Sequence, residues 1–175
     1  MGVYVYPTLH LNRVNTKKGE TPNNAFCKTM AKEIIRKEPD KKYRGQPCSV
    51  TCVGTAYDHI HTWPFTIIKP EGMRYDGYLR LRDMNQFARE YLPIAKRIDF
   101  KKNERPRLKE FLQTNETRCC ICVLGHYLYA DAQTYWSFFD NDDDKVIAVW
   151  YLRVPSAGNT TRKASQKHLD SDRKD

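Results

Sequence analysis

The groups that cooperate in thiol catalysis follow one another along this 175-residue chain. Gln46 precedes Cys52 by six residues, in the segment QPCSVTC. His126 follows a glycine at the start of an apolar run, and Asp140 and Asn141 come 14 and 15 residues later. The chain therefore carries, in this order, an amide, a thiol, an imidazole, and a carboxylate or second amide.

Each of these groups has a defined use if the fold brings them together. A thiol at the N-terminus of a helix meets the positive end of the helix dipole and unbonded backbone N–H groups, which stabilise the thiolate. A neighbouring imidazole takes the thiol proton and later gives it to the leaving group. A carboxylate or amide on an adjacent strand holds the imidazole in one tautomer. A glutamine amide, together with a backbone N–H, can bind the oxyanion.

Two of these assignments have competitors nearby. Cys48 is an alternative nucleophile, but it lies only two residues after Gln46 and ahead of the expected start of a helix, so we prefer Cys52. Asp140 begins the acidic run DNDDD, which is typical of a turn and supplies an acid near this position by chance. The choice between Asp140 and Asn141 stays open.

The spacing of apolar residues predicts helices in the first part of the chain. Helices are expected over 25–37, from Ser49 or Thr51 to the residues before Pro64, over 83–92 and over 107–113. Because Ser49 or Thr51 is the natural N-cap, Cys52 would lie in the first turn of the second helix.

The second part of the chain is typical of strands. Short β-branched and aromatic segments, separated by turn residues, are expected to form an antiparallel meander over 119–124, 126–130, 134–139 and 145–152. Helices followed by a sheet predict an α+β fold. We expect one domain over 1–154, with an N-terminal arm over 1–22, and a polar, disordered tail over 155–175.

With these elements in place, the chain resembles a papain-like cysteine peptidase of a minimal bacterial or viral type. The resemblance spans 46–152 and is carried by QPCSVTC, by the Gly-His pair that opens a strand, and by FFDN at the end of the next strand. It implies a papain-like fold, in which a helical half with the cysteine helix packs on a C-terminal antiparallel meander. A valine follows Cys52, where many members of that family have an aromatic residue.

The resemblance also implies roles for the residues. Cys52 would attack, His126 would be the base, Gln46 would assist the oxyanion, and Asp140 or Asn141 would orient the imidazole. The implied activity is hydrolysis of a peptide, isopeptide or other acyl bond through a thioester, with no cofactor. Deamidation and acyl transfer use the same groups and are not separated from hydrolysis.

Metal binding is a weaker interpretation of the same residues. Asp58, His59 and His61 could ligate a metal or supply another base, but structural roles are preferred. Zinc is another use for the cysteines, yet the CCIC segment would point its side chains to opposite faces of a strand, which suits one tetrahedral site poorly. We therefore expect no metal.

The charge of the chain bears on its partners. Thirty basic residues against 21 acidic residues give a net charge of +9, concentrated over 96–109 and 153–175. Without a nucleic-acid recognition motif, these clusters are interpreted as solvated surface that favours an acidic protein or peptide substrate.

Other classes of function and location follow from what the sequence lacks. No apolar run approaches the roughly 20 residues that cross a bilayer, and the N-terminus lacks a signal-peptide pattern, so we expect no membrane partner and a cytoplasmic location in the producing cell or a host. The alternative to an enzyme is a non-enzymatic interaction module, such as a phage or host-directed binding protein, that keeps the fold. A basic nucleic-acid-binding domain ranks third.

Overall fold

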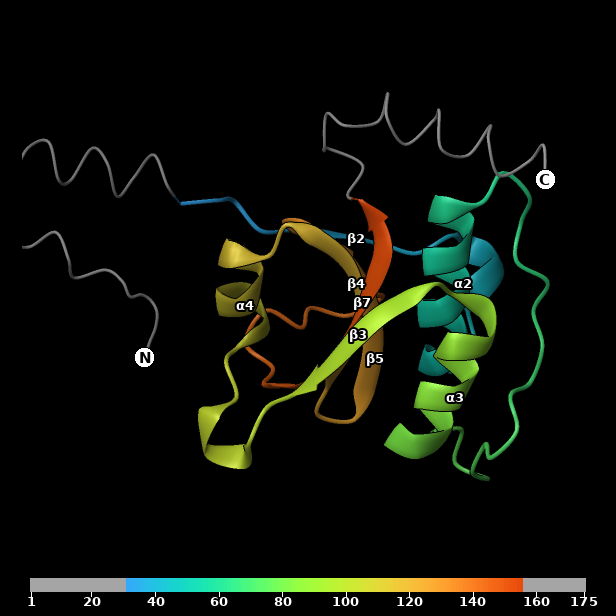
Figure 1. Cartoon of the computed structure of the whole chain (residues 1–175). Helices are drawn as coiled ribbons and strands as arrows, with labels where there is room; N and C mark the ends of the chain where they lie inside the picture. Colours follow the sequence, from blue (N-terminus) through green and yellow to red (C-terminus); the bar gives the residue numbers. More distant parts are fainter. Residues whose placement is uncertain (1–30, 156–175) are drawn as a thin grey trace, which may run out of the picture.

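The computed structural model describes residues 31–155. Within this range the chain is α+β, with three α-helices, two short 3-10 helices and a mixed six-stranded sheet (Figure 1). Three expected segments lie outside the described residues: the arm over 1–22, residues 25–30 of the helix expected over 25–37, and the tail after residue 155. No helix between residues 31 and 155 has the length and apolar character that crossing a membrane requires.

Three of the four expected helices are confirmed within the described range. They are α2 (Cys48–Ile60), α3 (Leu81–Tyr91) and α4 (Leu108–Thr114). The helix expected over 25–37 is wrong where it can be examined, because residues 31–34 have no regular structure and β2 (Ile35–Lys37) is a strand. This segment pairs in parallel with β6 (Thr134–Trp136), so a distant strand overrides the local helical spacing.

The strand order of the sheet is β2-β6-β5-β4-β7-β3. The meander is confirmed for β4 (Thr117–Val123), β5 (His126–Asp131) and β6, which pair antiparallel in sequence. It is wrong for β7 (Val146–Pro155), which returns to pair with β4 on the other side.

A sixth strand was not expected from the sequence. The basic segment after α3 forms β3 (Ile94–Asp99), which pairs antiparallel with β7 at the edge of the sheet. Arg97 lies over the Trp150 ring at 5.2 Å and its Nε donates to Asp99 at 2.8 Å. The basic cluster over 96–109 was interpreted as solvated surface, but its residue Arg97 packs against the sheet.

The sheet separates two hydrophobic cores. Helices α2 and α3 cover one face and α4 covers the other, to the right and left of the sheet in Figure 1. Side chains that alternate along a strand enter different cores. Cys120 and Cys122 pack with α2 and α3, whereas Cys119 and Ile121 pack with α4. The expected alternation of the CCIC segment is confirmed.

A glycine turn sets the start of β5, and the second residue of that strand packs in the core shared with α2. The turn between β4 and β5 contains Gly125 with a φ of +75°, a conformation that favours glycine, and β5 begins directly after it at His126. Tyr127 packs in the core shared with α2 and donates its hydroxyl proton to the carbonyl oxygen of Leu79. Its ring stacks on Tyr78 at 5.6 Å.

Candidate functional site

Cys48 is the first residue of α2. The helix begins here because Pro47 has an extended conformation while its carbonyl oxygen already accepts the N–H of Thr51 at 3.0 Å. The expected caps are therefore wrong: Ser49 and Thr51 lie inside the helix. The thiol at the positive end of the helix dipole is that of Cys48, and it is free and only partly buried.

Burial and backbone N–H groups act on the pKa of Cys48 in opposite directions. Burial raises this pKa, and the backbone N–H groups of Tyr127, Cys48 and Ser49 lower it. Two of these donors belong to the first turn of α2, and the third belongs to β5. Tyr127 faces the core shared with α2, whereas His126 is paired with Val123 and lies on the α4 face of β5, so the structure does not bring the imidazole and the Cys48 thiol together.

Cys52 lies in a different environment from the one expected. It is in the second turn of α2, its exposed fraction is 1%, and it packs in the core beside Cys120. Burial, followed by the neighbouring Cys120 thiol, raises the pKa of Cys52 well above its ordinary value. The expectation that Cys52 opens the helix is wrong, and its thiol is both protonated and covered.

His126 begins a chain of hydrogen bonds. Its Nε2 lies 3.2 Å from Ser137 Oγ, which donates to Asn141 Oδ1 at 2.6 Å. Asn141 Nδ2 then donates to Asp144 Oδ2 at 2.7 Å. Ser137 and Asn141 are buried. The sequence singled out His126 and Asn141 but neither Ser137 nor Asp144; the signal available was a serine within the aromatic run YWSFF.

The chemistry of this chain fixes where its protons lie. An ionised Asp144 only accepts, so Asn141 presents its amide to Asp144 and its carbonyl oxygen to Ser137. The single hydroxyl proton of Ser137 goes to Asn141, so the remaining bond requires His126 Nε2 to donate. The hydrogen-bond network thus assigns the proton of the neutral imidazole to Nε2 and leaves the lone pair on Nδ1.

Burial lowers the pKa of His126 below its ordinary value, and the Asp144 carboxylate acts in the opposite direction. The ring of Phe139, whose side chain is 63% exposed, meets the imidazole edge to face at 5.8 Å. The imidazole is therefore neutral at pH 7 and partly shielded.

Asp140 takes part in the turn and not in this chain. Its Oδ1 accepts from the N–H of Asp142 at 3.0 Å and from the Tyr135 hydroxyl at 3.5 Å. Of the two residues that the sequence left open, Asn141 is the one connected to His126.

Gln46 lies two residues before α2 and is exposed. Its N–H donates to the carbonyl oxygen of Tyr43 at 3.0 Å, which holds the segment that enters the helix. Together with Pro47 and Val50 it lines a surface hollow of about 320 Å³. Gln46 is therefore two residues from the accessible thiol, which is that of Cys48, and not six residues from it as expected for Cys52.

The residues considered for metal binding have structural partners. Asp58 accepts from the Tyr43 hydroxyl at 2.7 Å and from the N–H of Phe65 at 2.8 Å. His59 Nδ1 lies 2.8 Å from the carbonyl oxygen of Thr55, and His61 stacks on an exposed tryptophan. Among residues 31–155, no group of three or more histidine, cysteine, aspartate or glutamate side chains is placed to hold a metal ion.

No protein-family model, curated protein or solved structure matches the chain.

Proposed function

We propose that the protein is a thiol hydrolase of the papain-like type, with Cys48 as its nucleophile in place of Cys52. The observation that carries this proposal is the position of Cys48: among the cysteines within residues 31–155, it is the one that opens a helix and is partly exposed. It packs against the core that contains Tyr127, the chain neighbour of His126. The substrate is a peptide, isopeptide or other acyl bond.

In the proposed reaction, the Cys48 sulfur attacks the carbonyl carbon while Nδ1 of His126 takes the thiol proton, which requires the imidazole at the start of β5 to move from the α4 face of the sheet toward α2. The Cys48 N–H and the Gln46 amide are the candidate donors to the oxyanion that forms. The imidazolium then gives its proton to the leaving amine, and a thioester remains on Cys48. Water, deprotonated by the same imidazole, attacks the thioester; the acid is released, and the imidazolium returns the proton to the departing Cys48 sulfur.

The hydrogen-bond chain behind His126 supports this use of the imidazole. Ser137 and Asn141 hold Nε2 as a donor, so Nδ1 is free to accept a proton. Since burial raises the pKa of Cys48 and lowers the pKa of His126, both groups are uncharged at rest. His126 therefore acts as a general base during attack, and not as the partner of a resting thiolate.

Alkylation of Cys48 tests the pair directly. The rate of iodoacetamide labelling at pH 7.5, mapped by mass spectrometry, is expected to fall by about 100-fold in His126→Ala, because general-base assistance contributes about 10²–10⁴-fold. His59→Ala is the matched control, since this histidine is on α2 but bonds to Thr55. Equal rates in the wild type and both variants would contradict the proposal.

A non-enzymatic interaction module is the second candidate. The observation that favours it is that burial opposes the charged form of both Cys48 and His126. A module of this kind would label slowly at Cys48 with and without His126, and it would hydrolyse no member of a fluorogenic peptide library.

A further inference from the structure

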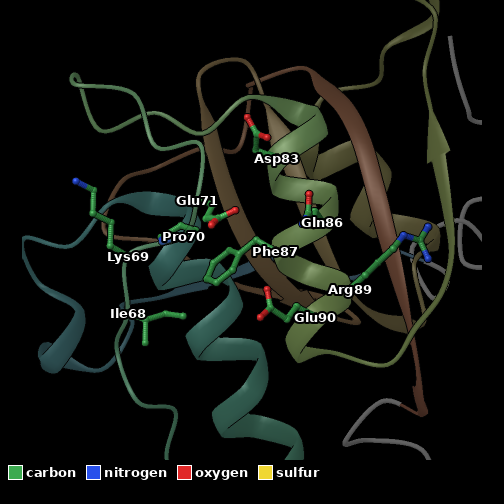
Figure 2. A pocket seen from close by; sticks show the side chains of 9 residues that line it. All are labelled: Ile68, Lys69, Pro70, Glu71, Asp83, Gln86, Phe87, Arg89 and Glu90. Carbon is green, nitrogen blue, oxygen red and sulfur yellow. The ribbon is translucent and has the colours of Figure 1, made fainter.

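Two adjoining hollows, together called the groove, lie along the segment 67–73 between the N-terminus of α2 and α3. Its first hollow, of about 320 Å³, is bounded at one end by Gln46 and Pro47 and is otherwise mainly apolar; the other lining residues are Val50, Ile67, Ile68, Lys69 and Met73. Its second hollow, of about 580 Å³, lies between that segment and α3 (Figure 2). Ile68 and Lys69 line both hollows, so the two hollows adjoin the same segment.

The second hollow combines an apolar floor with negative charge. Figure 2 shows the Phe87 ring at its centre, with the carboxylates of Glu71 and Glu90 turned toward the space beside the ring. The two basic side chains of the lining, Lys69 and Arg89, point away from this space (Figure 2). Arg89 donates instead to Asn85 on α3 at 3.1 Å.

The wall of the groove is held against α3 by a close backbone approach. Gly72 has a φ of +89°, and a Cβ placed on it would lie 2.5 Å from the carboxyl carbon of Asp83 in the first turn of α3. Only a glycine permits this contact. The position of Glu71 relative to Phe87 therefore follows from the packing of its neighbour on the helix.

The charge of the groove is the reverse of the charge of the chain. The net charge is +9, yet none of the ion pairs within residues 31–155 involves Glu71, Asp83 or Glu90. Phe87 is only 3% exposed, so the complementarity rests on the carboxylates of Glu71 and Glu90, which attract the charged end of a Lys or Arg side chain.

We infer that this groove binds the substrate polypeptide, with apolar side chains in the hollow beside Gln46 and a basic side chain between Glu71 and Glu90. The inference rests on the proposed function for the identity of the occupant as a substrate. It reverses the expectation, drawn from net charge, of an acidic substrate: the groove selects a basic one.

Peptide binding to the full-length Cys48→Ala protein tests the groove without requiring catalysis. The probes are fluorescein-labelled hexapeptides, Gly-Leu-Leu-Gly-Lys-Lys and its reversed sequence, compared with the same peptides carrying Glu for Lys or Ser for Leu. Fluorescence anisotropy is expected to give about fivefold tighter binding for the better Lys peptide than for its Glu counterpart, since two exposed ion pairs contribute about 0.2–1 kcal/mol each. Serine in place of leucine should weaken binding.

Two double variants with the same change in charge locate the effect. Glu71→Gln with Glu90→Gln should abolish the preference for lysine, whereas Glu33→Gln with Glu104→Gln, at exposed positions outside the groove, should preserve it. Equal binding of Lys and Glu peptides, or equal effects of the two double variants, would overturn the inference.

These outcomes are separable from those of the proposed function. Groove-dependent binding by Cys48→Ala, with no hydrolysis by the wild type, would retain the groove as a peptide site and reject the hydrolase. Hydrolysis without any preference that Glu71 and Glu90 control would retain the hydrolase and reject the groove.

Discussion

Ser137→Ala should destabilise the protein, because the Ser137 hydroxyl bonds to three groups at once. It donates to Asn141 Oδ1 at 2.6 Å, accepts the N–H of Phe139 at 3.1 Å and meets His126 Nε2 at 3.2 Å. The side chain is 2% exposed, so water cannot replace it without rearrangement.

The size of the effect follows from the groups left without a partner. A buried polar atom that loses its hydrogen bond costs about 1–3 kcal/mol, and Asn141 Oδ1 and His126 Nε2 both lose theirs. We expect a total loss of about 2–3 kcal/mol, which for a chain of this size lowers Tm by roughly 7 °C. Urea unfolding followed by circular dichroism measures the free energy, and a thermal scan measures Tm.

Ser49→Ala is the matched control. The Ser49 hydroxyl is also buried, with an exposed fraction of 0%, but its oxygen has no hydrogen-bond partner within the described residues. Removing an unpartnered hydroxyl, at a helical position where alanine is favoured, should stabilise the protein by about 1 kcal/mol. If Ser137→Ala changed stability by less than 0.5 kcal/mol, or if both variants destabilised alike, the hydrogen-bond network would not hold as described.

Three further results are expected. In the native protein at pH 8, Cys48 should react with iodoacetamide at least tenfold faster than Cys52, as mapped by mass spectrometry, because burial covers Cys52; comparable rates would contradict its packing. The pKa of His126 is lower in the folded protein than its ordinary 6.5, so the folded state binds fewer protons there, and the stability present above pH 6.5 is lost as pH falls through the folded pKa. Urea unfolding at pH 7.5 and 5 should show a smaller loss for His126→Gln than for the wild type, and parallel losses would refute this. Gly54→Ala should cost about 1–3 kcal/mol in urea unfolding, although alanine favours helices, because the new methyl group would overlap the Tyr43 ring; a stabilised variant would show that the ring moves freely.

The elements confirmed from the sequence are those whose signals are local. Helix α3 shows apolar residues at helical spacing and ends ahead of Pro93, and α4 follows Pro106. The hairpin of β4 and β5 is marked by β-branched and aromatic residues on both sides of Gly125. In each case, neighbours within a few positions supply both the apolar face and the point at which the element ends.

The strands that were missed form the two edges of the sheet. β2 is three residues long, and β3 carries exposed Lys96 beside Arg97. Neither has the apolar alternation of a half-buried strand. The strands that pair with them lie far along the chain, at Thr134–Trp136 for β2 and on β7 for β3. Edge strands take their conformation from the backbone bonds that a neighbour offers, which no local pattern encodes.

The sequence alone determined the chemical groups of the candidate site: a thiol near a glutamine, a histidine opening a strand, and an amide at the following turn. The tertiary structure decided which of two thiols is available. Cys48 and Cys52 are one helical turn apart, yet β4 buries Cys52 beside Cys120, whereas Cys48 is partly exposed at the N-terminus of the helix. Solvation and hydrogen bonding set the pKa and the accessibility of a thiol, and both come from strands that are distant in the sequence.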